Sequence, residues 1–175
     1  ATAGEVLIGG RDVKSFEIPE LRERIGIVPQ KAVLFKGSIR DNMRWGKDDA
    51  TDDEILAAAK TAQAADVIES KGGLDFEIEQ GGKNLSGGQR QRFTIARALV
   101  RKPEILILDD SASALDFATD AALRRSIREM DTNPTVFIVS QRTSSIQHAD
   151  KIIVLDDGNI AGIGKHDELL NNCPV

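Results

Sequence analysis

A serine followed by two glycines is the chain's clearest candidate for phosphate chemistry. The segment Leu85–Gln89 has the sequence LSGGQ and precedes a stretch with helical apolar spacing. Ser86 is a good helix N-cap, and Gly87 and Gly88 would let a phosphate reach the bare backbone. Free amides and the dipole at a helix N-terminus bind anions. An ordinary serine-capped helix with a Gly-Gly turn has the same pattern, so the spacing alone leaves both interpretations open.

A pair of acids provides the second candidate site. Four apolar residues, Ile105 to Leu108, precede Asp109 and Asp110, and such a run is typical of a strand buried on both faces of a parallel sheet. The acids would then lie at the carboxyl edge, where α/β sheets bind ligands. Asp109 could hold Mg²⁺, because that ion prefers oxygen ligands, and Asp110 could orient or activate a water. A strand that ends in a solvated acidic turn would have the same sequence, and this alternative also stays open.

The elements that must position these residues alternate along the chain. Apolar runs and helical patterns follow one another, which predicts an α/β fold with a mainly parallel sheet flanked by helices. Buried strands are expected at 105–108, 135–139 and 151–155, and short strands at 5–8 and 25–28. Helices are expected at 19–23, after Thr51, and at 86–100, 120–130 and 166–170. Residues 71–84 predict a loop, and Asp157-Gly158 predicts a hairpin turn into 160–163.

Bulk properties limit the classes of function. With 175 residues, 41% of them hydrophobic and 29% charged, the chain can form one domain with a buried core. A net charge of -5 gives no large basic footprint, so a nucleic-acid partner is not expected. A lone cysteine, Cys173, cannot form an internal disulfide and fits a reducing compartment. No apolar run approaches the roughly 18 residues needed to span a bilayer, so we expect any membrane contact to belong to another segment or chain.

In order and spacing, these segments resemble the ATP-binding domain of ABC (ATP-binding cassette) transporters over nearly the whole chain. The resemblance makes Leu85–Gln89 the LSGGQ signature and Asp109 the Walker B aspartate that holds Mg²⁺. It also makes Gln30 the Q-loop glutamine, which senses nucleotide and meets the transmembrane part, and Ser113–Asp116 the D-loop, which crosses the interface of an ABC dimer.

Two further stretches are similar to exporter-type ABC domains, namely Leu34–Asn42 (LFKGSIRDN) and the tail from Ala149 to Leu169. The resemblance implies that residues 1–175 are part of one ABC ATPase domain of the P-loop NTPase type. A helical signature subdomain would be inserted at about 31–100, and the remainder would be a RecA-like core. The implied ligands are ATP, bound through Gln30, Ser86, Gly87, Gly88, Gln89 and Asp116, and Mg²⁺, bound through Asp109 and Gln30. The implied partners are a second ABC nucleotide-binding domain and a transmembrane domain, at the cytoplasmic face of the cell membrane.

The sequence departs from the family pattern in three places. The Walker A motif G-x-x-x-x-G-K-[ST] does not occur, so we expect that the N-terminal part of the domain is missing and that this chain cannot bind ATP by itself. Asp110 stands where the family usually has the glutamate that polarises the attacking water. Gln141 stands where the family has the histidine of the switch loop, and glutamine cannot carry a proton at neutral pH.

The two substitutions at one site indicate slow or absent hydrolysis there. Because the signature is intact, the chain would still complete the site of a partner, which favours the degenerate half of a heterodimeric exporter. Two alternatives remain: a non-hydrolysing regulatory half that keeps ATP bound, and a soluble ABC ATPase without a transport role. Trp45 is expected either in the core or on the helical subdomain.

Overall fold

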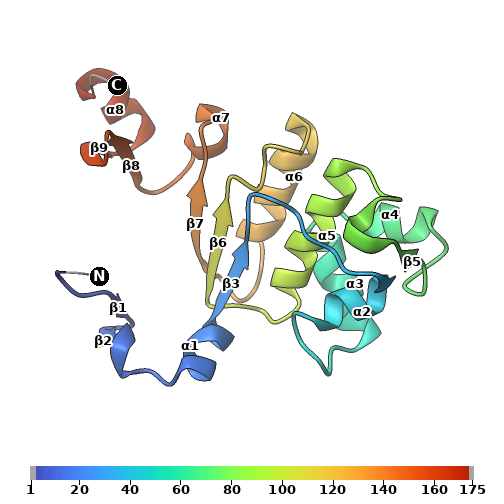
Figure 1. The fold of residues 1–175 in the computed structure, drawn as a ribbon. Coiled ribbons are helices and arrows are strands. Elements are labelled where there is room, and N and C mark those ends of the chain that lie inside the picture. Colours follow the sequence, from blue (N-terminus) through green and yellow to red (C-terminus); the bar gives the residue numbers. More distant parts are fainter. Residues whose placement is uncertain (1–2, 174–175) are drawn as a thin grey trace.

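The structure, a computed structural model, describes residues 3–173 and has a parallel sheet at its centre (Figure 1). The three strands, in order across the sheet, are β3 (Ile25–Val28), β6 (Ile105–Asp109) and β7 (Thr135–Val139). All run in the same direction, with Val28 opposite Leu108 and Asp109 opposite Val139. The predicted α/β class with a mainly parallel sheet is confirmed.

Helices cover one face of this sheet. Two of them, α5 (Gly87–Leu99) and α6 (Phe117–Arg128), lie beside the strands in Figure 1. Leu106 and Leu108 of β6 are buried in one core with Phe93 of α5 and Leu123 of α6. Burial of this apolar surface is what fixes the sheet against the two helices that follow the candidate site segments.

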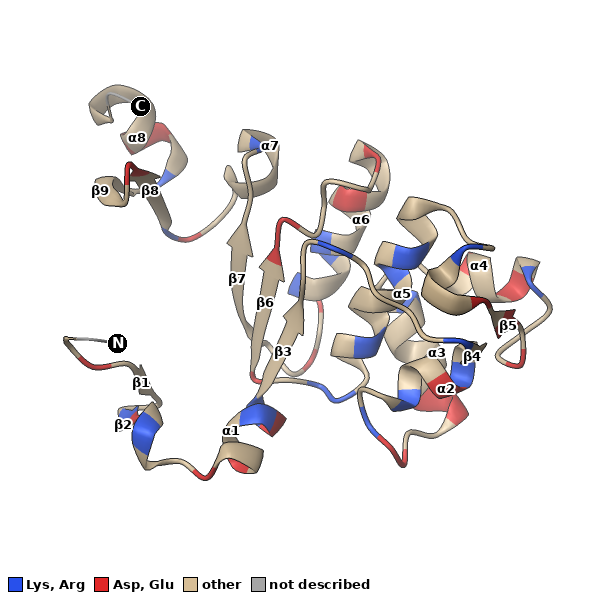
Figure 2. Cartoon of the chain, in the orientation of Figure 1, with Lys and Arg blue, Asp and Glu red and all other residues tan. Residues whose placement is uncertain are grey.

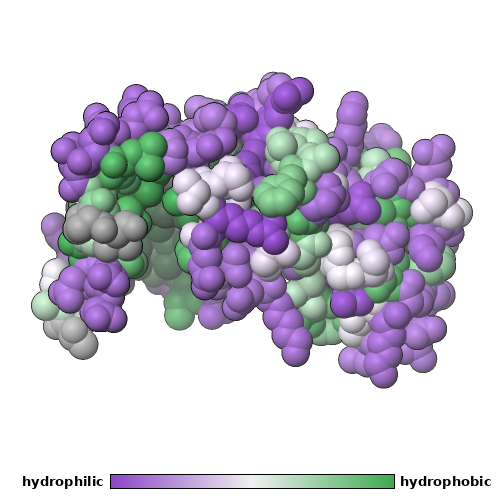
Figure 3. Space-filling view, turned by 90° about the horizontal axis from the view of Figure 1, so that it is seen from above, coloured by the Kyte–Doolittle hydropathy of each residue, from purple (hydrophilic) through white to green (hydrophobic). Residues whose placement is uncertain are grey.

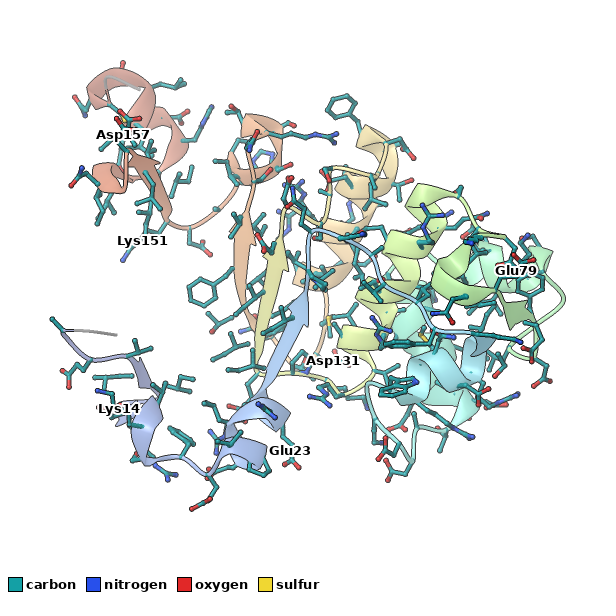
Figure 4. All side chains as sticks on the ribbon, in the orientation of Figure 1. Lys14, Glu23, Glu79, Asp131, Lys151 and Asp157 are labelled. Atoms are coloured by element: carbon teal, nitrogen blue, oxygen red, sulfur yellow. The ribbon has the colours of Figure 1, made fainter. Side chains whose placement is uncertain are left out.

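The opposite face of the sheet is not covered by the described part of the chain. Ile27, Phe137 and Val139 alternate with the buried positions and are 59%, 56% and 55% exposed. Side chains project from β7 into the space beside the sheet (Figure 4), and apolar surface is visible between the sheet and the terminal segments (Figure 3). The strands are apolar at successive positions, as in sheets that are buried on both faces.

A group of short helices lies beside α5, on the side away from the sheet (Figure 1). It comprises α2 (Ile39–Arg44), α3 (Asp52–Thr61), α4 (Ala65–Ser70) and an antiparallel pair, β4 (Gly37–Ser38) and β5 (Glu77–Ile78). Ser38 and Thr51 each close a capping box with the acid three residues later, which explains where α2 and α3 begin. Met43 and Ile55 are fully buried and pack these helices into the core shared with α5.

The two terminal segments lie on the side of the sheet opposite to these helices (Figure 1). The N-terminal segment comprises β1 (Leu7–Ile8), β2 (Arg11–Asp12), a 3₁₀ turn (Val13–Ser15) and α1 (Ile18–Arg24). After β7 the chain forms α7 (Thr143–Ile146), the antiparallel pair β8 (Ile152–Asp156) and β9 (Asn159–Gly164), and α8 (His166–Asn172). Within residues 3–173, no helix is long and apolar enough to cross a bilayer.

The strands predicted at 135–139 and 151–155 form, but the prediction that they are buried is wrong. In β7, Thr135, Phe137 and Val139 are exposed. In the described residues β8 pairs only with β9, and Ile153 and Leu155 are 54% and 66% exposed. The apolar run forms a strand, but no other described element packs on these outward positions. The predicted hairpin is confirmed, because Asp157 and Gly158 have φ of 45° and 78°, the left-handed values that a two-residue type I′ turn requires.

Two further predictions need correction. The helix expected at 120–130 begins at Phe117, because Asp116 caps it, and the loop expected at 71–84 contains β5 and a 3₁₀ turn, Gln80–Gly82. Of the two positions expected for Trp45, the structure excludes the core: the side chain is 66% exposed and stacks on Phe35, with the ring centroids 4.8 Å apart, on the surface of the group of short helices.

Candidate nucleotide site

The loops after all three parallel strands meet at one edge of the sheet. Gln30 follows β3, Asp110 follows β6 and Gln141 follows β7, and the register of the strands places them at the same carboxyl edge. The Gln30 amide nitrogen Nε2 donates a hydrogen bond of 3.1 Å to Oδ2 of Asp110. The structure therefore joins two of the residues that the sequence analysis selected, although 80 positions separate them in the chain.

The two acids of this edge have different environments. Asp109 ends β6, and its exposed side chain accepts no hydrogen bond from any residue between 3 and 173. Asp110 has a positive φ of 43° and its backbone nitrogen donates to the Val139 carbonyl at 2.9 Å. Figure 2 shows acidic residues where β6 ends. A strained backbone held by a neighbouring strand fixes the direction in which the Asp110 carboxylate leaves the sheet.

Gln141 is exposed, and its side chain forms no hydrogen bond within the part of the chain that the structure describes. It shares the edge with the other two residues, but no direct contact joins it to Asp110 there. An amide that is free of protein partners can donate and accept, but cannot take up a proton at neutral pH.

The signature segment begins α5 as the sequence predicts. Ser86 is the N-cap: its Oγ accepts from the Gln89 nitrogen at 3.2 Å, and Gln89 Oε1 accepts from the Ser86 nitrogen at 3.0 Å. Gly87 and Gly88 are the first two residues of the helix, so their amides have no intrahelical acceptor. Both alternatives of the sequence analysis are thus compatible with the geometry, because the capped helix leaves two amides for an anion.

The signature segment lies next to the D-loop segment. A Cβ at Gly88 would come within 3.2 Å of the Ala114 carbonyl oxygen, so only glycine fits there without a shift. Asp116, which stays a predicted nucleotide contact, caps α6: it accepts from the Thr119 nitrogen at 2.9 Å and from the Thr119 hydroxyl at 2.8 Å. These two hydrogen bonds hold the pKa of the Asp116 carboxyl below its ordinary value.

Sequence reasoning missed Arg142, which follows Gln141 and is the N-cap residue of α7. Its guanidinium donates to the backbone carbonyls of Ala112 at 3.2 Å, Ser113 at 2.9 Å and Leu115 at 3.4 Å. Because the acceptors are backbone atoms some 30 positions away, no side-chain pattern in the sequence marks this contact. Its only signal is its place directly after the switch segment.

The edge suits a magnesium nucleotide that binds on the surface. Mg²⁺ is usually held by one or two carboxylates together with phosphate and water, and Asp109 offers such a carboxylate. The described residues contain no group of three or more acidic, histidine or cysteine side chains that could hold a metal, so phosphate and water would complete the ion's ligands. The cavity behind the edge, lined in part by Ser111, Asp120 and Ser140, has about 10 Å³, room for about one water.

A sheet whose loops converge on one edge, next to a helix opened by glycines, defines a nucleotide-binding domain. The chain belongs to the ABC transporter family, whose model matches residues 1–113. It is 43% identical over 176 residues to an uncharacterized ABC transporter ATP-binding protein of Mycobacterium tuberculosis, covering 99% of this chain and 30% of that protein. It is 45% identical to the beta-(1→2)glucan export ATP-binding/permease protein NdvA of Rhodopseudomonas palustris, covering 96% of this chain and 28% of that protein.

A solved structure agrees with this family. The structure of a bacterial Atm1-family ABC exporter with ATP bound matches 97% of this chain with a TM-score of 0.91 and 40% sequence identity. The match covers 30% of the exporter chain, and this chain spans about 30% of the length of the curated relatives as well. The domain is therefore an ABC ATP-binding domain with exporter-type relatives.

Proposed function

We propose that the chain is the ATP-binding domain of a membrane exporter that couples ATP binding and hydrolysis to transport. The observation that carries the proposal is the hydrogen bond between Gln30 and Asp110, beside the exposed Asp109 at the end of β6. Exporter-type relatives support the same assignment. The partner domains would be a transmembrane domain and a second ABC nucleotide-binding domain, at the cytoplasmic face of the membrane.

Each residue of the edge has a distinct role in this proposal. Asp109, with Gln30, would hold Mg²⁺, and the ion would supply positive charge to neutralise the phosphate oxygens. Asp110 orients a water for attack. The amides of Gly87 and Gly88 donate to phosphate oxygens of a nucleotide held by the partner domain, with Ser86 and Gln89 keeping the start of α5 in place.

We further propose that this chain's own site hydrolyses ATP slowly and that the chain is one half of a heterodimer. Asp110 is one methylene shorter than glutamate, and one of its oxygens is engaged by Gln30. Gln141 cannot become charged at neutral pH. The isolated 175-residue chain is expected to be inactive, because the Walker A motif that would cradle the phosphates does not occur in it.

Reconstitution of the full-length protein with its partner in lipid vesicles tests the proposal. We expect ATPase activity that the pair loses when the signature is altered at Gly87, and ATP-driven transport into the vesicles. A regulatory half would bind ATP at its own site, and a single-turnover experiment would show no hydrolysis of that ATP. Full ATPase activity with an altered signature, or recovery of the protein from cells without any membrane fraction, would contradict the exporter assignment.

A further inference from the structure

Arg142 connects two segments that lie about 30 residues apart in the chain. It follows the switch residue Gln141, and its backbone nitrogen donates to Ser140 Oγ at 3.0 Å, which fixes the turn between β7 and α7. From there its half-buried side chain reaches the backbone of Ala112, directly before the D-loop segment, and of Ser113 and Leu115 within it. One guanidinium thus donates to three carbonyls.

The guanidinium suits this task because it is planar, stays charged and presents several donors in a fixed arrangement. Arg142 Cζ also lies 5.7 Å from the centre of the Phe117 ring, at the start of α6. A lysine would bring its three donors on a single nitrogen, whereas Arg142 uses two, Nη1 for Ala112 and Leu115 and Nη2 for Ser113. The arrangement therefore suits arginine better than lysine.

The D-loop segment in turn contacts the beginning of α5. The Ala114 carbonyl lies where a side chain at Gly88 would come within 3.2 Å, so a movement of Ala114 changes the space at the first turn of the signature helix. A continuous series of contacts thus runs from Gln141, through Arg142 and the backbone at 112–115, to Gly88.

We propose that Arg142 is a positioning residue. Through it, the turn at Gln141 in this chain's own nucleotide site fixes the position of the D-loop segment and of the start of α5, which serve the partner's site. The inference rests on the proposed function, in which Gly87 and Gly88 contact the partner's nucleotide. A displacement of the turn at Gln141 would move Arg142 and, through its three hydrogen bonds, the backbone at 112–115.

The hydrogen bonds of Arg142 contribute more to the position of the backbone at 112–115 than to the stability of the domain. Ala112 and Ser113 are at least partly exposed, so water can satisfy their carbonyls when the guanidinium is removed. Only Leu115 is buried, and it accepts the longest of the three hydrogen bonds, 3.4 Å, so the penalty for an unpaired buried group is confined to that carbonyl. The loop keeps local hydrogen bonds, from the Ser113 nitrogen to Asp110 and from the Leu115 nitrogen to Ala112. Loss of Arg142 should therefore loosen the segment without unfolding the domain.

The test compares Arg142→Ala, Arg142→Lys and the control Arg128→Ala in the full-length protein assembled with its partner. Arg128 is exposed on α6, and its side chain forms no hydrogen bond or ion pair within residues 3–173. We expect Arg142→Ala to lower kcat of the pair about tenfold, since small misplacements in an active site cost up to about a hundredfold. The KM for ATP should stay within about twofold, because kcat falls with interactions needed in the transition state alone. Arg142→Lys should fall between, and the control should match the unsubstituted pair.

Hydrogen exchange of the same assemblies provides a readout that does not depend on turnover. Amides of residues 111–117 should exchange faster in Arg142→Ala, while those in the middle of α5 keep their protection. Unchanged exchange at 111–117, or a kcat equal to that of the control, overturns the inference. If Gly87 variants abolish ATPase activity while Arg142→Ala does not lower it, the inference fails and the proposed function stands. An unsubstituted pair without ATPase activity refutes the proposed function itself.

Discussion

Replacing Ser86 with aspartate separates the capping of α5 from the phosphate site that we propose at its start. Aspartate caps helices about as well as serine, so it can accept from the Gln89 nitrogen as the Ser86 hydroxyl does at 3.2 Å. Its charge, however, would face the phosphate that Gly87 and Gly88 are proposed to bind. Two unit charges about 4 Å apart repel by about 4 kcal/mol at an effective dielectric constant of about 20, which corresponds to about a thousandfold in affinity.

The assay is ATP hydrolysis by the assembled full-length pair, with thermal unfolding of the same samples. Ser86→Asp should lose nearly all activity at an unchanged melting temperature. Thr51→Ala is the matched control, because Thr51 caps α3 with the same reciprocal pair of hydrogen bonds to Glu54. It should cost about 1 kcal/mol of stability and leave hydrolysis intact. Normal hydrolysis by Ser86→Asp would refute a phosphate site at the start of α5.

Three further predictions concern the sheet edge and the D-loop. Asp109→Asn should abolish the Mg²⁺ dependence of nucleotide binding by the full-length protein, measured by isothermal calorimetry with and without the ion; retained dependence would exclude Asp109 as a ligand. Thr119→Val should raise the pKa of Asp116 toward its ordinary value, because the two hydrogen bonds that lower it most come from Thr119 and the variant removes the one from the hydroxyl. The stabilisation linked to a lowered carboxyl pKa is present above the ordinary pKa and is lost as the pH falls through the folded value. The variant should therefore lose this stabilisation at a higher pH than the unsubstituted protein. A carboxyl NMR titration measures the pKa of Asp116 in both proteins. Restoring Asp110→Glu together with Gln141→His should raise turnover at this chain's own site more than the two single changes combined, measured with the partner's site inactivated.

The position of the acids could be predicted because it depends on a local pattern. A run of apolar residues from Ile105 to Leu108 is long enough for one buried strand, and whatever follows it must lie at the edge of the sheet. The same reasoning fails for β8, whose apolar run carries no information about what packs on it: Leu155 is 66% exposed. A strand can be inferred from its own residues, whereas its burial depends on distant ones.

The contacts around the D-loop segment could not be predicted for a related reason. Asp116 is followed three residues later by Thr119, a spacing that suits an N-cap, but the resemblance to a nucleotide-binding loop predicted a ligand contact and gave no indication of the cap. Arg142 donates to carbonyls, and every residue has a carbonyl. When a side chain donates to a backbone carbonyl, the acceptor can be any type of residue, so the sequence gives no indication of the contact.

The hydrogen bond between Gln30 and Asp110 bears most directly on how the two halves of the proposed transporter would differ. It joins the loops after β3 and β6, which the parallel register places side by side. A glutamate at position 110 would carry its carboxylate about one carbon–carbon bond further from the strained backbone, so it could reach a water while Gln30 turned to a metal ion. With aspartate, an oxygen that should orient water is held by the glutamine that should hold Mg²⁺, and Gln141 offers no proton acceptor in compensation. Nothing in this conflict touches Gly87 and Gly88 at the start of α5, which supports a division of labour in which this chain serves its partner's nucleotide better than its own.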